Sequence, residues 1–230
     1  MRSRKDESNW ISISDMMTGL MVVFMFIAIN YIMQVIEYKF VEQDVYNALS
    51  EEFQQEIEEQ EIQLSPDGTV TFNPADKVLF RTGSNLLTSD FHEILDDFIP
   101  RYLQTITTYG NLDYIKEIRI EGHTDTVPPR SGMDSYSYNL ALSSSRAQSV
   151  LEKVRGSHDF LSLELPIKKR LEFLLTANGM SYSRALNSEG EVVYTSENKA
   201  IDNDKSRRVE FRIVTSSEKL VKEIYDEQDL

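Results

Sequence analysis

The longest uniform pattern in the chain is an apolar run from Met16 to Ile36 that contains no charged side chain. An α-helix rises about 1.5 Å per residue, so a run of this length covers the roughly 30 Å hydrocarbon core of a bilayer. Trp10 lies before the run and Tyr38 after it, where aromatic side chains favour a membrane interface. The pattern predicts one membrane-spanning helix over residues 11–36.

A cleaved signal peptide is the alternative explanation of this run, but the run is longer than the apolar part of such a peptide. Residues 34–40 also offer no small-residue cleavage site. Basic side chains precede the run at Arg2, Arg4 and Lys5, whereas the stretch behind it is acidic. Because positive charge favours the cytoplasmic side, we expect residues 1–10 in the cytoplasm. The part beyond the helix is then expected outside, which in a bacterium is the periplasm.

Residues 37–61 are rich in Asp and Glu and carry an apolar residue at every fourth position. This apolar stripe consists of Val41, Val45, Leu49, Phe53 and Ile57. Such a stripe predicts an acidic amphipathic connector helix. Its four-residue step drifts around the helix, so a long regular coiled coil is not supported. Two partners for the stripe stay open: a second copy of the chain, or the chain's own domain.

Beyond the connector, the pattern alternates short strands with amphipathic helices. A Pro-Asp-Gly turn signal at 66–68 predicts a hairpin, and Thr88 or Ser89 supplies a helix cap. We expect strands at 62–65, 69–72, 114–121 and 208–214, helices at 88–108, 140–154 and 161–177, and a polar loop at 185–206. This order predicts an α+β domain over residues 62–217, followed by an acidic tail at 218–230.

Composition narrows the range of functions. The chain has 230 residues and a formal net charge of −14. Nucleic-acid binding needs a basic patch, and the sequence contains no Lys/Arg-rich stripe, so nucleic acid is not an expected partner. Cysteine is absent and the 3 histidines lack metal-ligand spacing, so we expect neither a disulfide nor a metal site. The sequence contains no nucleophile–base arrangement, and we do not expect an enzyme.

One acidic residue, Asp15, lies one helical turn into the predicted membrane helix. Placing a carboxylate in hydrocarbon costs roughly 2.5–3.5 kcal/mol, so Asp15 is expected to face a partner helix or a water-filled path. Thr18 and Gly19 share its helical face and would let another helix approach closely. A protonatable group there is a candidate ion carrier, with Thr18 beside it. The alternative is that Ser14 and Asp15 cap the start of the helix.

Three sequence blocks in the C-terminal part resemble the OmpA-like peptidoglycan-binding family. They are Ile120-Glu-Gly-His-Thr-Asp125, Asn139-Leu-Ala-Leu142-Ser-Ser-Ser-Arg146-Ala147, and Asp204-Lys-Ser-Arg207-Arg-Val-Glu210. The resemblance covers about residues 61–215. It implies a small mixed sheet backed by helices.

The same resemblance implies a site for the diaminopimelate of the wall peptide. Its candidate residues are Thr124, Asp125, Asn139, Leu142, Arg146 and Arg207. An amino acid head group needs a carboxylate for its ammonium and a forked guanidinium for its carboxylate, which Asp125 and Arg146 supply. Arg146 could instead pair with a surface acid, and Asp125 could cap a turn before Pro128. His123 belongs to the motif, and we expect a structural role for it.

The N-terminal block Trp10-Ile-Ser-Ile-Ser-Asp15-Met-Met-Thr18 resembles MotB-type stator subunits. In that family the Asp carries the transported ion, H⁺ or Na⁺, and the helix sits as a dimer inside a pentamer of MotA-type subunits. The long spacing between Asp125 and Asn139 also looks MotB-like, whereas the stretch 179–185 lacks the family's Pro. The short N-terminus and compact connector resemble the B subunits of Zorya anti-phage systems more than flagellar stators.

These patterns together predict a single-pass protein of the bacterial inner membrane that is anchored in peptidoglycan and coupled to ion flow. We expect a stator subunit in anti-phage defence, with no cofactor besides the transported ion. Its expected partners are peptidoglycan, a second copy of the chain and MotA-like multi-pass subunits. Two alternatives stay open: a flagellar MotB-type motility stator, and a passive cell-wall tether without ion transport.

Overall fold

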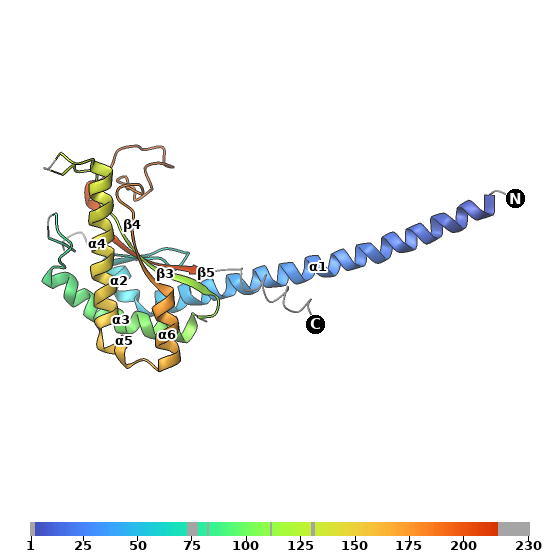
Figure 1. Cartoon of the computed structure of the whole chain (residues 1–230), viewed down its shortest axis with the longest axis horizontal. Coiled ribbons are helices and arrows are strands. Elements are labelled where there is room, and N and C mark those ends of the chain that lie inside the picture. Colours follow the sequence, from blue (N-terminus) through green and yellow to red (C-terminus); the bar gives the residue numbers. More distant parts are fainter. Residues whose placement is uncertain (1–2, 73–77, 82, 111, 130–131, 216–230) are drawn as a thin grey trace. The chain divides into compact units, whose positions relative to one another are not determined.

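The computed structural model describes residues 3–72, 78–81, 83–110, 112–129 and 132–215 (Figure 1). The chain divides into an N-terminal unit that ends at Phe40 and a second unit, Val41–Ser216. Helix α1, Ser3–Glu52, is continuous through this boundary. The predicted acidic tail, residues 218–230, lies outside the described residues.

The part of α1 that is long and apolar enough to cross a membrane is Ile13–Met33, a stretch of 21 residues with a mean hydropathy of 2.0. It lies within the predicted span, residues 11–36. Its apolar side chains are exposed along the whole stretch. Such exposure is expected of side chains whose partners are lipid or other chains.

A five-stranded mixed sheet with the order β1-β2-β5-β3-β4 organises the second unit. Its strands are β1 (Ile62–Leu64), β2 (Val70–Phe72), β3 (Ile115–Gly122), β4 (Leu175–Gly179) and β5 (Val209–Thr215). β3 and β4 are parallel, and the other neighbouring pairs are antiparallel. The predicted α+β fold with a mixed sheet is confirmed. The hairpin is also confirmed, and its turn needs Gly68, whose φ is 74°.

The helices of the second unit are set by recognisable caps. They are α2 (Gln54–Glu58), α3 (Ser89–Tyr109), α4 (Ser135–Gly156), α5 (His158–Ser162), α6 (Leu165–Leu174) and α7 (Asn203–Ser206). The Thr88 hydroxyl accepts the Phe91 N–H at 3.2 Å, which is the cap predicted for α3. The Asp134 carboxylate accepts the Ser137 N–H at 2.8 Å, and α4 therefore begins earlier than the predicted start at 140.

The helix predicted over residues 161–177 is interrupted between α5 and α6, which begins at Leu165, and it is wrong at its C-terminal end. The chain instead ends α6 at Leu174 and enters β4, which pairs with β3 from Ile118↔Leu175 to Gly122↔Gly179. A short buried strand cannot be told from a continuing helix by apolar spacing alone, and here pairing with β3 decides. The polar loop predicted at 185–206 also differs, because it ends in α7.

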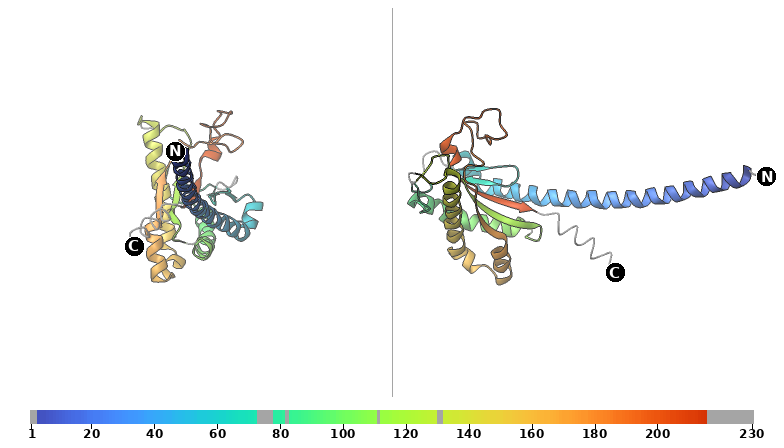
Figure 2. Two further views of the ribbon diagram at one scale, coloured as in Figure 1. Left: turned by 90° about the vertical axis from the view of Figure 1, so that its right-hand side faces the viewer. Right: turned by 45° about the horizontal axis from the view of Figure 1, so that its top comes forward.

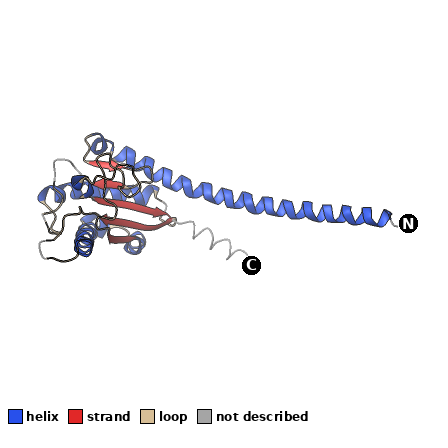
Figure 3. Cartoon of the chain, turned by 90° about the horizontal axis from the view of Figure 1, so that it is seen from above, coloured by secondary structure: helices blue, strands red, loops and turns tan. Residues whose placement is uncertain are grey.

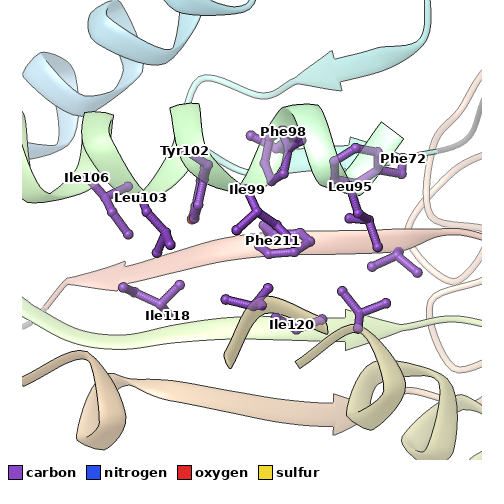
Figure 4. Packing of buried hydrophobic residues seen from close by; sticks show 14 of the residues in the cluster. Phe72, Leu95, Phe98, Ile99, Tyr102, Leu103, Ile106, Ile118, Ile120 and Phe211 are labelled. Atoms are coloured by element: carbon purple, nitrogen blue, oxygen red, sulfur yellow. The ribbon is translucent and has the colours of Figure 1, made fainter. Parts of the chain in front are cut away.

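An aromatic-rich core joins the sheet to α3 (Figure 4). The ring centroid of Phe98 on α3 lies 4.8 Å from that of Phe72 on β2 and 5.2 Å from that of Phe211 on β5. Ile118 and Ile120 of β3 extend the same buried cluster. α4 packs on β3 and β4 and adds its own apolar side chains to this core. The strands and surrounding helices can be followed from other sides in Figures 2 and 3.

The apolar stripe of the connector packs on the chain's own domain from Val45 onward, and the side chain of Val41 lies outside the described residues. Val45, Leu49 and Phe53 are 2%, 0% and 1% exposed within the core, and Ile57 packs against it. Full burial of such a side chain stabilises the fold by about 1.5–3 kcal/mol. Of the two partners considered for the stripe, the structure therefore supports docking on the same chain.

Arg101 of α3 forms ion pairs with acidic residues of the connector and of its own helix. Its Nε lies 2.7 Å from Glu52 Oε1, and a terminal nitrogen pairs with Glu56 and lies 2.8 Å from Asp97 Oδ2. Its guanidinium carbon lies 4.5 Å from the centroid of the Phe53 ring. Burial by itself would raise the pKa of Glu56, but the hydrogen bond and charge of Arg101 outweigh burial and lower that pKa. The connector is thus held by both apolar and ionic contacts.

Candidate functional site

Two glycines let α4 lie directly on the C-terminal ends of β3 and β4. A Cβ atom at Gly122 would overlap the carbonyl oxygen of Ser143, and one at Gly179 would overlap the backbone nitrogen of Ser144. Side chains cannot approach backbone atoms so closely, so these strand ends require glycine. The close approach brings the buried face of α4 beside the loop that follows β3.

Asp125 lies in this loop and is held on both carboxylate oxygens. Its Oδ1 accepts the Val127 N–H at 3.0 Å, and its Oδ2 accepts a terminal N–H of Arg207 at 2.6 Å. The Asp125 side chain is 13% exposed, so a small part of the carboxylate remains accessible. Asp125 therefore caps the turn through Oδ1, as one of the two alternatives proposed. Its Oδ2 remains paired with the guanidinium of Arg207.

Arg146 reaches the same place from α4. Its Nε donates a hydrogen bond to the carbonyl oxygen of Ser84 at 3.0 Å, and its guanidinium carbon lies 4.9 Å from the centroid of the Phe80 ring. Burial lowers the pKa of Arg146, and the negative charge of Asp125 opposes this shift. Among the described residues, none accepts a hydrogen bond from its terminal nitrogens. This guanidinium therefore presents a fork that suits a carboxylate.

The other candidate residues of the wall-peptide site have different surroundings. The Asn139 side-chain amide donates to the carbonyl oxygens of Val127 at 3.2 Å and Ser135 at 3.0 Å, which ties the loop to α4. The Thr124 hydroxyl is buried without a hydrogen-bond partner among the described residues. Leu142 lies half-buried on α4. Asn139 therefore positions the loop, whereas Thr124 leaves a polar group unused.

Asp125 and Arg207 form an ion pair at 2.6 Å. Arg146 is near both, because the charges of Asp125 and Arg207 contribute to the shift of its pKa. The sequence did not indicate Phe80 and Ser84, which contact the guanidinium of Arg146 through a ring face and a backbone carbonyl. They lie in an irregular segment far away in sequence, and no local pattern signals their role. Asp204 was also missed, although its spacing from Arg207 on a helical turn could have indicated the pair.

A second charged cluster lies between β3 and β5, where His123 meets two buried carboxylates. Its Nε2 lies 3.4 Å from Glu121 Oε2 and 3.7 Å from Glu210 Oε2. Such a donor set can bind a metal ion by geometry. However, Arg184 lies 3.1 Å from Glu121 Oε2 and Arg208 lies 2.6 Å from Glu210 Oε1, so a divalent cation would meet positive charge. We therefore assign the cluster to pairing of the two strands.

The candidate ion carrier Asp15 lies well inside α1, which begins at Ser3. The possibility that Ser14 and Asp15 cap the helix start is therefore wrong. The Thr18 hydroxyl donates to the Ser14 carbonyl oxygen at 2.8 Å, and both Asp15 and Thr18 are exposed on the helix surface. Asp15 and Thr18 are thus available to another helix.

Comparison with known proteins adds two kinds of relative. The chain is 32% identical to a Zorya protein ZorB from Escherichia coli (strain Crooks), over 97% of this chain and 96% of that protein. It is 26% identical to a ZorB from Escherichia coli O139:H28, over 92% of this chain and 83% of that protein. No family model matches the chain.

Among solved structures, a putative MotB-like protein from Desulfovibrio vulgaris is similar with a TM-score of 0.51 and 23% identity. The match covers 80% of this chain and 96% of that one. At this level of identity, the likeness concerns the fold, which is that of MotB-like domains.

Proposed function

This chain belongs to the ZorB family of Zorya proteins, and from that premise we propose that it is the wall-anchored stator subunit of an ion-driven membrane motor in anti-phage defence. The observation that carries the proposal is one chain with a carboxylate inside a membrane-length helix and a zwitterion-matched charge pair in a MotB-like domain. We place the protein in the bacterial inner membrane as a single-pass subunit, with its N-terminus in the cytoplasm and its domain in the periplasm.

The wall end of the proposal rests on Asp125 and Arg146. Peptidoglycan stems carry an amino acid head group with an ammonium and a carboxylate, and the two side chains offer one partner for each. Both are largely buried, so their charges are screened less than surface charges. Thr124, Asn139 and Leu142 belong to the proposed site around this pair.

The membrane end of the proposal rests on Asp15, which we assign as the carrier of H⁺ or Na⁺, with Thr18 beside it. An exposed carboxylate within an apolar helix is costly unless another polar surface faces it. That surface is supplied, in this proposal, by a MotA-like multi-pass partner, assembled as a pentamer around two copies of this chain. No other cofactor is part of the proposed mechanism.

The decisive test of ion transport is Asp15→Asn in cells that carry the complete operon. Asn keeps the size of the side chain and its hydrogen bonding but cannot exchange a proton. We expect the efficiency of phage plating to return to that of cells without the system, at an unchanged protein level. Asp44→Asn, an exposed acid of the same helix outside the span, is the matched control and is expected to keep protection.

Two results would point to the alternatives. Full protection with Asp15→Asn would contradict ion transport and leave a passive wall tether. If swimming in a motile host is lost while plating of phages is unaffected, the chain serves a flagellar motor instead.

The wall site has its own test, co-sedimentation of the full chain in detergent with purified peptidoglycan sacculi. Truncating one partner of a buried charge pair costs a binding site several kcal/mol, so Asp125→Asn and Arg146→Gln are each expected to reduce binding at least about tenfold. Glu152→Gln, an exposed acid on α4, should bind as the unmodified chain does. Unchanged binding by Asp125→Asn, with thermal unfolding also unchanged, would contradict the assigned site.

A further inference from the structure

Arg207 bridges two carboxylates at the rim of the candidate site. One terminal nitrogen lies 2.6 Å from Asp125 Oδ2, and the other pairs with Asp204 Oδ1. The side chains of Asp125, Arg207 and Asp204 are 13%, 44% and 88% exposed, respectively. The bridge therefore runs from an almost buried acid to one that is open to solvent.

The charges around Asp125 are balanced before any ligand arrives. Arg146 is buried nearby, where the charge of Asp125 raises its pKa and the charge of Arg207 lowers it. Two guanidinium groups and two carboxylates thus share one small region. The Oδ1 atom of Asp125 accepts the Val127 N–H and its Oδ2 accepts an N–H of Arg207, so an incoming ammonium that binds Oδ2 approaches the oxygen that Arg207 already pairs with.

We propose that Arg207 is a displaceable counterion of Asp125, which yields that carboxylate to the ammonium of the ligand and stays tethered to Asp204. This inference rests on the proposed wall-binding function and deepens it. In this arrangement Arg207 does not grip the ligand. It keeps Asp125 paired until an ammonium takes its place, and Asp204 lowers the cost of the exchange.

The exchange makes the site selective for head groups that carry both charges. A ligand with a carboxylate alone can bind Arg146 but cannot displace Arg207 from Asp125. A ligand with an ammonium alone brings positive charge close to Arg146, which opposes its binding. A zwitterionic head group satisfies Asp125 and Arg146 together and restores the charge balance after Arg207 has moved.

The test uses two substitutions with opposite expected effects on the affinity of the full chain for meso-diaminopimelic acid, measured by isothermal titration calorimetry. Arg207→Gln removes the cation that pairs with Asp125 and should tighten binding of the ligand. Asp204→Asn removes the second partner of Arg207, so that Arg207 pairs with Asp125 only, and should weaken binding of the ligand. Because exposed ion pairs contribute up to about 1 kcal/mol, each change is expected to be roughly two- to fivefold. Arg155→Gln, an exposed arginine of α4 that pairs with Glu172 at 3.8 Å, is the matched control.

The outcomes separate this inference from the proposed function. If the unmodified chain binds, Asp125→Asn abolishes binding and Arg207→Gln also weakens it, then Arg207 contacts the ligand directly and the inference is overturned. An unchanged affinity in Asp204→Asn would equally overturn the tethering role of Asp204. If the unmodified chain binds neither the free amino acid nor sacculi, the wall-binding function fails, and this inference fails with it.

Discussion

Gly179 shows at the scale of one residue how closely the site depends on packing. A Cβ atom there would overlap Ser144 of α4, the helix that carries Arg146. We expect Gly179→Ala to force α4 away and to lower the free energy of unfolding by roughly 1–3 kcal/mol, as overpacking does. Urea denaturation measures this loss.

The control for Gly179→Ala is Gly156→Ala at the last residue of α4, where an added methyl group meets no atom within 4 Å apart from its chain neighbours and the backbone of its own helix. Alanine there restricts the unfolded chain, so stability should stay the same or rise. If both substitutions leave the urea midpoint unchanged, the close approach of α4 to β4 is not required.

Glu210 offers a pH-dependent test at the same scale. Burial by itself would raise the pKa of Glu210, but His123 and Arg208 outweigh burial and lower that pKa in the folded protein. Its ionised form therefore contributes stability that is present above the unfolded value near 4.5 and is lost as pH falls below it. We expect the free energy of unfolding to decline from about pH 5 downward.

The variant Glu210→Gln shows how much of the decline in the free energy of unfolding at low pH is due to Glu210. Glu210→Gln leaves the buried Arg208 without its ion pair and should destabilise the fold by about 3 kcal/mol at neutral pH. The loss should shrink as the pH falls below about 4.5, because Glu210 of the unmodified chain then binds a proton in the unfolded state while it stays ionised in the folded state. A loss that is the same at pH 7 and pH 3.5 would contradict the role of charge.

At the scale of elements, the connector tests how the ionic and apolar contacts combine. Arg101→Met keeps much of the side-chain volume over Phe53 but removes the ion pairs with Glu52, Glu56 and Asp97. Because these groups are partly exposed, we expect a loss of only about 1–2 kcal/mol in stability. Hydrogen exchange of the backbone around Leu49 should speed up more than that of β3, since the connector opens first.

Lys169→Met, at an exposed cation of α6, controls for the loss of one positive charge and should change neither quantity. Equal exchange rates around Leu49 in Arg101→Met and the unmodified chain would show that the apolar stripe alone holds the connector.

Elements could be predicted where local signals are strong. The hairpin followed from its Pro-Asp-Gly turn, and α3 followed from its cap at Thr88. β4 was missed because Leu171 and Leu174 keep helical spacing up to the strand, and only pairing with the distant β3 defines it. The partner of the connector stripe stayed open for the same reason, since an amphipathic helix does not specify what it packs against.

In the candidate site, some residues could likewise be predicted from local motifs, whereas others depend on long-range packing. Asp125 and Arg146 could be predicted from motifs, because each lies in a recognisable block. That Arg207 pairs with Asp125 depends on the geometry of two strand ends far apart in sequence. The contributions of Phe80 and Ser84 depend on the same kind of long-range packing and have no signal in the sequence.

At the scale of the whole molecule, one helix carries both the candidate ion carrier and part of the domain core. α1 contains Asp15 near one end and the buried Leu49 near the other. Neither Gly nor Pro occurs between Gly19 and Pro66, so this stretch lacks the two residues that most weaken a helix interior.

The domain limits give the last test, since the predicted start at Ile62 excludes the connector, whereas the compact unit begins at Val41. A fragment of residues 62–217 lacks Val45, Leu49 and Phe53, all of them buried. At about 1.5–3 kcal/mol each, their loss removes much of the roughly 5–15 kcal/mol that stabilises a typical domain. We expect a fragment of residues 41–217 to unfold cooperatively and the shorter one to be largely unfolded or aggregated at 37 °C. Circular dichroism during heating distinguishes them, and equal melting temperatures would show that the connector is dispensable for the fold.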